Sequence, residues 1–371
     1  MDTVIQKVTF PESRRILVLS DPHGHREGVL SLLARAAFSK DDILVIVGDL
    51  LEKGPDSLGL LREVMRLSKT HTVYTLMGNV DYWRYIGIMT ESEKEQRELV
   101  SFSLAARKWW GMSFLEELLD EIGVPLTEDL DTKRVFPLIK AHFAKELSFL
   151  ENCPAILETE NMIFVHGGIP HENTDALKNE ERHNFLKWDR FLSAGLSFQK
   201  TVVVGHWPVT LYSPSFPNAA PLWEKRQNIL SIDGGCGVKK EGQINLLIFP
   251  SVDSKDYTLL TWDGLPTVRA LDSQAASTDF SYIRWGDDEV AVLENDGENA
   301  IVLYRGKKMS VPAKGLFISG GVQRASEITD YRLPVSPGDT LSVITETKNG
   351  LYAKKGSVTG WYMGRYESSG H

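Results

Sequence analysis

The most constraining feature of the sequence is a short apolar run that ends at a polar side chain, usually beside glycine. Residues 43–57, ILVIVGDLLEKGPDS, begin as a buried strand and reach Asp49 directly after glycine. A carboxylate at the end of a buried strand costs free energy unless a partner compensates its charge. The same pattern recurs at four further strand ends, which deliver Asp21 with His23, Asn79, His166 and His206. We therefore expect the strand ends to converge on a metal site.

The first hundred residues alternate between predicted strands and helices, as in a parallel α/β sheet. Apolar runs at 16–20, 43–47 and 73–77 alternate with amphipathic helical patterns at 27–38 and 58–67. Units of about thirty residues are typical of right-handed parallel crossovers. In such open sheets, ligands bind beyond the carboxyl ends of the strands. This is where Asp21, Asp49 and Asn79 are expected to lie.

Two later regions break this rhythm. Residues 82–150 carry three helical patterns, which predict an insertion that either walls the site or serves as plain scaffold. A small polar linker at 273–279 precedes short alternating strands with Asp-Gly and Asn-Gly turns. We expect a domain over 1–272 and a small β-barrel-like region over 278–371. GDTLSVI and GWYMGRY resemble small bacterial Src-homology-3-like barrels, so this region is expected to bind a protein partner or to pack against the first domain.

The composition limits the classes of binding partner and the cellular compartment that we expect for this protein. The 371 residues carry a formal net charge of −9, which gives no electrostatic case for nucleic acid or an anionic membrane. Only two cysteines occur, Cys153 and Cys236, without metal-ligand spacing or a disulfide framework. No apolar run approaches the length of a membrane span, and no signal peptide is apparent. We expect a cytoplasmic protein.

The polar strand-end residues are the ligand types that hard and borderline divalent metals take together. Six candidates follow from the pattern: Asp21, His23, Asp49, Asn79, His166 and His206. One aspartate can bridge two ions, and Asp49 is the natural bridge. Asp21, His23 and Asp49 would hold one ion, and Asp49 with the three remaining residues the other. Two ions roughly 3.5–4 Å apart are the arrangement used for in-line phosphoryl displacement.

These motifs carry a resemblance to a known family. Asp-x-His-Gly, Gly-Asp-x-x-acid-base-Gly, Gly-Asn-x-acid, His-Gly-Gly and Gly-His occur in this order between residues 14 and 272. The set resembles the calcineurin-like metallophosphoesterases, and within them the phosphoprotein phosphatase branch. Its bacterial members include lambda-type phosphatases and symmetric diadenosine tetraphosphate hydrolases. The resemblance implies a four-layer α/β fold, a β-sandwich flanked by helices, and two divalent ions of manganese, iron or zinc.

The resemblance also assigns further site residues. Lys53 stands where the family has a phosphate-binding arginine, and Arg190 resembles a second phosphate arginine that follows a tryptophan. Lysine supplies charge without the bidentate fork of arginine. His25 follows the first motif and faces the substrate or lies in a solvated loop. Asp49, Glu52, Lys53 and Arg190 are thus the catalytic candidates, and Lys53, Arg190 and His25 the candidates for substrate binding.

One departure from the family concerns the acid step. The third motif normally has a histidine after its asparagine, where this chain has Val80. That histidine assists the leaving group and pairs with an aspartate of the second motif, where this chain has Glu52. Both members of the pair have changed, while the metal ligands remain.

Three functions stay open at this point. The first is hydrolysis of phosphate monoesters by a metal-bridging hydroxide, as in a Ser/Thr/Tyr phosphoprotein phosphatase. The second is hydrolysis of dinucleoside polyphosphates or nucleotides. The third is a non-catalytic metal-binding interaction module, which Val80 keeps open. The substrate is accordingly a phosphorylated protein or a nucleotide.

Overall fold

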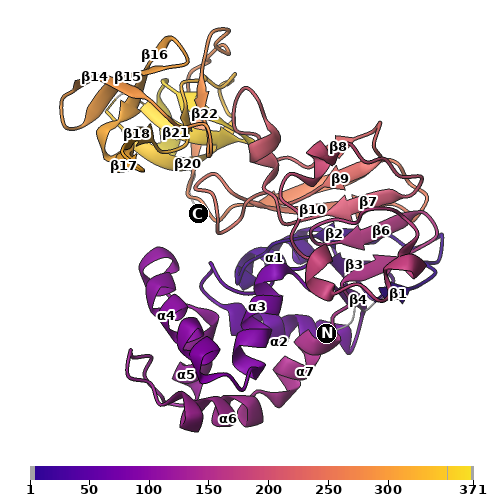
Figure 1. Cartoon of the computed structure of the whole chain (residues 1–371). Helices are drawn as coiled ribbons and strands as arrows, with labels where there is room; N and C mark the ends of the chain where they lie inside the picture. The colour runs from indigo at the N-terminus through magenta and orange to yellow at the C-terminus, as the bar shows by residue number, and fades with distance from the viewer. Residues whose placement is uncertain (1–4, 349, 369–371) are drawn as a thin grey trace. The chain divides into compact units, whose positions relative to one another are not determined.

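The computed structural model describes residues 5–348 and 350–368 of the chain. It separates into two compact units, coloured along the chain in Figure 1. The first unit contains Met1–Pro208 and Pro221–Trp262, and the second contains Val209–Ala220 and Asp263–His371. The chain thus enters the second unit twice.

The first unit is built on two sheets. One sheet has the order β11-β10-β2-β3-β4, and the other has the order β1-β5-β6-β7-β9-β8. The first sheet contains β2 (Ile16–Leu19), β3 (Ile43–Ile46), β4 (Thr72–Thr75), β10 (Ile244–Phe249) and β11 (Thr258–Trp262). The second contains β1 (Ile5–Lys7), β5 (Ile156–Glu158), β6 (Met162–Val165), β7 (Thr201–Val204), β8 (Leu222–Glu224) and β9 (Ile229–Ser231).

The two sheets share a core. Val18 and Val45 of the first sheet belong to the same buried cluster as Phe164, Val203 and Leu230 of the second. Strands β2, β3 and β4 are parallel, as are β6, β7 and β9. The predicted β-sandwich is confirmed, and its parallel strands bring several carboxyl ends together in each sheet.

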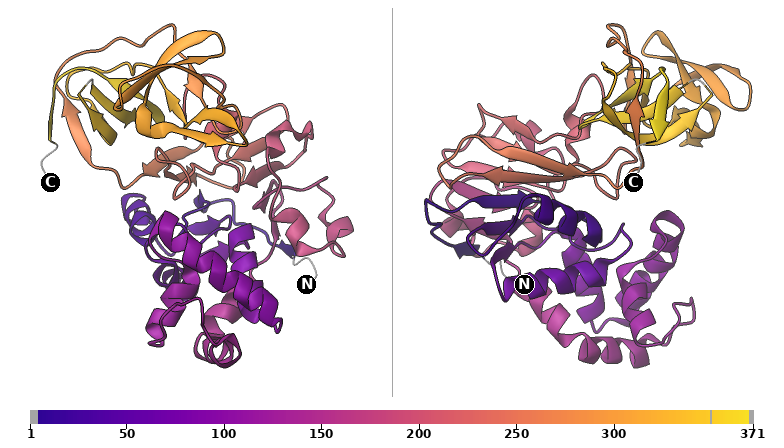
Figure 2. Two further views of the ribbon diagram at one scale, coloured as in Figure 1. Left: turned by 60° about the vertical axis from the view of Figure 1, so that its left-hand side comes forward. Right: turned by 180° about the vertical axis from the view of Figure 1, so that it is seen from behind.

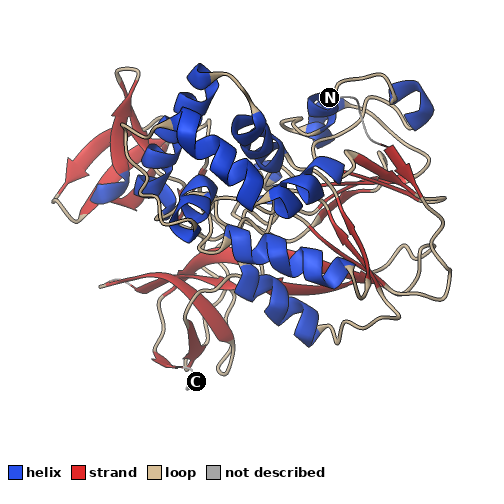
Figure 3. Ribbon diagram, turned by 90° about the horizontal axis from the view of Figure 1, so that it is seen from below, coloured by secondary structure: helices blue, strands red, loops and turns tan. Residues whose placement is uncertain are grey.

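The helices cover the first sheet and extend into the insertion. Figure 3 shows helices flanking the strands. The helices are α1 (Arg26–Arg35), α2 (Ser57–Ser68), α3 (Asn79–Met89), α4 (Glu93–Trp110), α5 (Phe114–Glu121), α6 (Thr132–His142) and α7 (Ala144–Asn152). Helix α2 begins where the Asp56 side chain accepts a hydrogen bond from the amide of Gly59. Short 3-10 turns follow at η1 (Thr174–Leu177), η2 (Arg182–Phe185), η3 (Phe191–Ala194) and η4 (Val209–Tyr212).

The predicted insertion is helical and shares a core with the helices around it. Leu61 and Val64 of α2 lie in one buried cluster with Phe114 and Leu118 of α5 and Phe136 of α6. Such burial of apolar faces against each other is the main source of helix stability in proteins. Figure 1 shows α3 to α7 gathered in one group. Because α3 begins at a predicted metal ligand, the insertion is continuous with the site.

The described part of the second unit consists of strands, loops and two short 3-10 turns, η4 and η5 (Ala313–Gly315), and strands dominate its orange to yellow segments in Figure 2. Its largest sheet has the order β22-β21-β20-β12-β23, from β12 (Thr267–Ala270), β20 (Thr340–Thr347), β21 (Gly350–Lys355), β22 (Val358–Tyr362) and β23 (Tyr366–Ser368). Smaller sheets pair β13 (Tyr282–Ile283) with β19 (Ile328–Thr329), and β17 (Leu316–Ser319) with β18 (Val322–Ala325). A third small sheet contains β14 (Ala291–Asn295), β15 (Asn299–Tyr304) and β16 (Lys307–Pro312).

The division between the units lies earlier than the sequence suggests. We expected the boundary between 272 and 278, whereas the chain divides after Trp262. The reason is β12, which pairs with β20 and β23 of the second unit. Residues 209–220 also join this unit, since the amide of Ala219 donates to the carbonyl of Ser357. Among the described residues, no helix combines the length and apolarity that crossing a membrane requires.

Candidate metal centre

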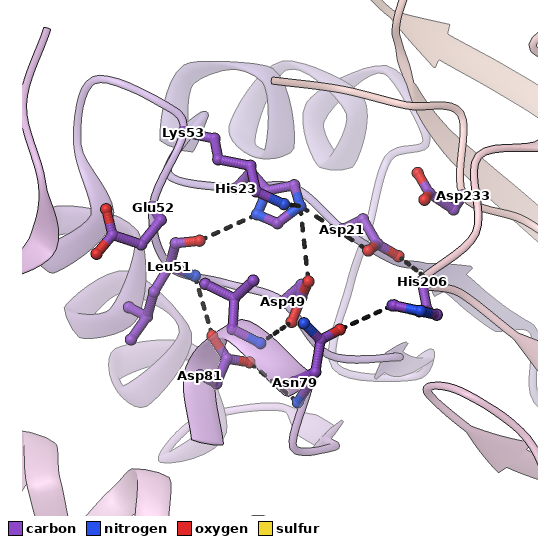
Figure 4. Close-up of polar contacts among 12 residues, drawn as sticks. Asp21, His23, Asp49, Leu51, Glu52, Lys53, Asn79, Asp81, His206 and Asp233 are labelled. Atoms are coloured by element: carbon purple, nitrogen blue, oxygen red, sulfur yellow. Dashed lines mark hydrogen bonds and ion pairs between the residues drawn. The ribbon is translucent and has the colours of Figure 1, made fainter. Parts of the chain in front are cut away.

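The six predicted ligands come together at the carboxyl ends of the strands. Asp21 and His23 follow β2, Asp49 follows β3, Asn79 opens α3, His166 follows β6 and His206 follows β7. Ligand atoms of Asp21, His23 and Asp49 lie within 4.8 Å of one another, and all three residues are buried. Figure 4 shows these side chains gathered in one cluster with Asn79 and His206.

Asp49 lies at the centre of the cluster. Its Oδ2 is 3.7 Å from Nε2 of His23, and its Oδ1 is 3.4 Å from Nε2 of His166. Oδ1 also accepts a hydrogen bond of 2.8 Å from the amide of Val80. The two carboxylate oxygens therefore face different histidines.

Asn79 joins the second group of ligands. Its Oδ1 lies 3.1 Å from Nε2 of His166 and 2.8 Å from Nδ1 of His206. Asp21 connects the two groups, because its Oδ2 accepts a hydrogen bond of 3.1 Å from the amide of His206.

The histidines are oriented by partners on their outer nitrogens. Nδ1 of His23 lies 3.0 Å from the carbonyl of Leu51, and Nδ1 of His166 lies 2.7 Å from the carbonyl of Val47. Nε2 of His206 lies 2.8 Å from Oδ1 of Asp189. With a metal bound, a proton on each outer nitrogen would leave the inner nitrogen as the ligand, as metal-ligating histidines require.

Backbone strain is concentrated at the predicted site. Ten non-glycine residues of the described chain have positive φ, and seven of them are predicted site residues: Asp21, His23, Asp49, Glu52, Lys53, Arg190 and His206. Each such conformation costs roughly 1–3 kcal/mol and persists only where the surroundings hold it. A Cβ on Gly78 would lie 2.1 Å from Oδ1 of Asp49, so glycine allows this close approach.

The charges of the cluster fit a divalent cation. Burial, and then the neighbouring Asp233, hold the pKa of Asp21 well above its usual range. Burial alone would lower the pKa of His166, but the carboxylates of Asp49 and Asp21 raise it to about 10. Buried carboxylates in contact are costly unless cations compensate them. With carboxylate, amide and imidazole donors together, the residues suit a hard or borderline divalent metal ion.

The other predicted site residues lie around this cluster in different ways. Nζ of Lys53 is 3.0 Å from Nε2 of His23, so it stands at the edge of the cluster. His25 instead contacts the carbonyl of Pro22. Arg190 is exposed, with its guanidinium 5.8 Å from the ring centre of Trp207.

Glu52 points away from the cluster, as Figure 4 shows. It is fully buried, and its Oε1 lies 2.5 Å from Nε of Arg84 on α3. The sequence pointed to Glu52 as a catalytic candidate, and the structure directs it toward an arginine.

A model of the calcineurin-like phosphoesterases matches residues 14–233, which is more than half of the chain. The chain belongs to this family. It is therefore a metallophosphoesterase by descent. All six predicted metal ligands lie within the matched residues. The comparison with curated proteins finds no match.

Solved structures similar to this phosphoesterase include three phosphatases. A putative diadenosine tetraphosphatase is 20% identical, with a TM-score of 0.43 over 71% of this chain and 100% of that one. A serine/threonine phosphatase from Saccharomyces cerevisiae with similarity to human phosphatase PP5 is 13% identical, with a TM-score of 0.43 over 71% and 84%. A cold-active protein-tyrosine phosphatase from a Shewanella species is 15% identical, with a TM-score of 0.39 over 69% and 81%.

Sequence reasoning missed three residues that surround the phosphoesterase site. Asp233 is buried beside the cluster, where burial raises its pKa to about 6. It follows β9 and precedes two glycines, so it carries the same signal that identified the other strand ends. Asp189, which bonds His206, and Arg84, which pairs with Glu52, carry no such signal because their partners are distant in the sequence.

Proposed function

We propose that this phosphoesterase is metal-dependent, resembles the phosphoprotein phosphatases, and hydrolyses phosphate monoesters whose leaving groups are stable anions. The observation that carries the proposal is the orientation of the Asp49 carboxylate. Its Oδ2 faces His23 and its Oδ1 faces His166. Asp21, His23 and Asp49 would hold one ion, and Asp49, Asn79, His166 and His206 a second. Divalent ions bound there would polarise the phosphoryl oxygens and lower the pKa of a water nucleophile.

The protein's own cations would orient the phosphate. Lys53 presents its ammonium at the edge of the ligand cluster, next to His23. A phosphate bound over the cluster would find this charge beside its oxygens, and a positioned cation stabilises charge that develops during transfer. Arg190 is the second candidate, because it lies one residue from Asp189, which holds His206.

The leaving group would receive little help from the protein. Val80 occupies the position of the family's histidine, is buried, and has no proton to donate. Glu52 accepts from Arg84 and points away from the cluster. An alkoxide leaves poorly without protonation, whereas aryl oxides and phosphates are stable anions. These observations favour aryl phosphates and phosphotyrosine over phosphoserine.

The same observation favours a second candidate function. In a dinucleoside polyphosphate the leaving group is itself a phosphate, which needs no proton at neutral pH. Hydrolysis of such an anhydride would therefore tolerate Val80 as well as hydrolysis of an aryl ester does.

A substrate panel tests both functions. Protein loaded with manganese is incubated with an aryl phosphate, phosphotyrosine and phosphoserine peptides, and a dinucleoside tetraphosphate, with chelator-treated protein as the control. We expect manganese-dependent release of phosphate from the aryl phosphate. A higher kcat/KM for phosphotyrosine peptides than for the dinucleoside tetraphosphate would support the monoesterase. A higher kcat/KM for the dinucleoside tetraphosphate would support the second candidate function. Metal-loaded protein that turns over none of these substrates would be a non-catalytic binding module.

A further inference from the structure

We propose that Arg84 is a positioning residue that holds Lys53 at the phosphate site by way of Glu52. The inference rests on the proposed function, because it assigns Lys53 to phosphate binding. It adds a residue of the helical insertion to the machinery of the strand-end loop. The juxtaposition that carries it is a buried ion pair one residue away from Lys53.

The ion pair is short and shielded from water. Nε of Arg84 lies 2.5 Å from Oε1 of Glu52, and the side chains are 13% and 0% exposed. Within the described residues, Oε2 of Glu52 has no hydrogen-bond partner. Removing the arginine would thus leave a buried carboxylate without its cation, which is far more costly than losing a surface pair.

The guanidinium is itself held in place by the next helix. Its Cζ lies 3.9 Å from the ring centre of Phe102 on α4, a cation–π contact. The planar group of Arg84 can stack on this ring while its edge bonds Glu52, which a lysine could not reproduce. The pair therefore connects the strand-end loop to two helices of the insertion.

Glu52 in turn fixes the backbone that carries Lys53. The two residues are consecutive and both left-handed, with φ of 65° and 64°. The amide of Glu52 donates to Oγ of Ser57 at 3.0 Å, and Nζ of Lys53 lies 3.0 Å from Nε2 of His23. Two adjacent strained residues persist only where contacts hold them. If Glu52 is released, the lysine is expected to lose its place at the edge of the ligand cluster.

Helix α3 holds this loop at three points, and they have different roles. The amide of Val80 donates to Asp49, and the side chain of Asp81 accepts from the amide of Leu51 at 3.0 Å. These two contacts support the metal-ligand part of the loop. The third, from Arg84, is made to Glu52, which directly precedes Lys53. Variants of Arg84 should therefore weaken phosphate binding while metal binding is retained.

The test is a double-mutant cycle on the full-length, manganese-loaded protein. The inhibition constant of inorganic phosphate is measured for the native protein, Arg84→Gln, Lys53→Gln and the double variant. We expect each single substitution to weaken phosphate binding about tenfold. Because Arg84 acts through Lys53, the double variant should lose no more than about twofold beyond Lys53→Gln. Manganese affinity, measured by calorimetry, should stay within about twofold in Arg84→Gln.

Further variants keep the test interpretable. Arg84→Lys retains charge and should recover part of the phosphate affinity. If Arg84→Gln does not fold, a variant that combines Glu52→Gln with Arg84→Gln replaces it in the cycle. This variant removes both buried charges together. Arg97→Gln breaks the exposed pair between Arg97 and Glu93 on α4, and it should leave phosphate binding unchanged.

Two results would overturn the inference. One is native phosphate affinity in Arg84→Gln, and the other is full additivity of the two substitutions, which would mean that Arg84 acts independently of Lys53. Failure of the proposed function is distinguishable, because native protein would then show no manganese-dependent turnover of an aryl phosphate.

Discussion

The two units of the chain make their sharp turns in different ways. In the first unit, the turns at the strand ends place aspartate, histidine, glutamate and lysine in the left-handed region of φ. In the second unit, Arg305 is the only non-glycine residue of this kind among those described. Its other left-handed positions are glycines: Gly264, Gly286, Gly297, Gly306, Gly320, Gly321, Gly338, Gly350 and Gly356.

The difference separates turns that carry chemistry from turns that only reverse the chain. Glycine enters the left-handed region at little cost, whereas other residues cost roughly 1–3 kcal/mol. A glycine would therefore be the more stable choice at Asp21 or Asp49 if only the turn mattered. The first unit accepts the strain because the side chain itself is needed at that point.

The largest expected effect comes from removing the charge of Asp49 while keeping its conformation. Asparagine tolerates the left-handed region as aspartate does, so Asp49→Asn should fold. It should abolish turnover of an aryl phosphate and weaken binding of manganese, because both ligand groups face this carboxylate. Calorimetric titration with manganese and a turnover assay check this. Native turnover in a folded Asp49→Asn would mean that the left-handed turn, and not the charge, is what matters there.

The second effect concerns Val80, which stands where the family has its acid histidine. Across phosphate esters of graded leaving-group acidity, kcat/KM of the native protein should rise steeply as the leaving group becomes more acidic. Val80→His should flatten this series by restoring an acid that typically contributes 10²–10⁴-fold. Native turnover of phosphoserine peptides as fast as aryl phosphates would mean that another group supplies the proton.

Much of this site could be predicted because its signals are local. An apolar run followed by a ligand beside glycine located Asp49 and Asn79. The alternation of strands and helices predicted parallel strands, which place both residues at the same edge of the sheet. Asp233 carries the same signal and could have been found in the same way. The sandwich followed from the family resemblance, and the helical insertion from its amphipathic patterns.

What the sequence did not reveal depends on contacts between distant segments. The pairing of Arg84 with Glu52 exists only once α3 has docked beside the loop. The boundary of the units was misplaced because an alternating strand such as β12 has the same pattern whichever sheet it joins. The excursion of residues 209–220 into the second unit rests on Phe216, which stacks on Tyr331 at 4.5 Å between ring centres.

A smaller effect is expected at Ala37, a left-handed residue outside the site. It follows the last turn of α1 with φ of 48°, and its side chain is exposed. Glycine is favoured at such a position after a helix, so Ala37→Gly should raise the free energy of unfolding by about 1 kcal/mol. Chemical denaturation of the two proteins measures this, and turnover should not change. A lower free energy of unfolding in Ala37→Gly would contradict the view that the left-handed backbone at Ala37 is strained and serves no catalytic purpose.

The smallest expected effect is that of the second unit on turnover. All proposed metal ligands and Lys53 lie in the first unit, so a chain that ends at Trp262 should keep its chemistry. Ending instead near Leu271 would retain β12 without its partner strands, so the earlier end is preferred. Phe216→Ser in the shortened chain removes an aromatic ring that would lose its partner Tyr331.

We expect manganese-dependent turnover of an aryl phosphate within about twofold of the full-length protein, normalised to bound manganese. A small soluble substrate is the right probe, because a macromolecular one could also contact the second unit. The full-length Phe216→Ser protein separates the effect of truncation from that of the substitution. A folded, metal-loaded truncation without turnover would show that the second unit contributes to the active site. In that event its glycine turns would no longer count as turns that only reverse the chain, and the contrast between the units would not hold.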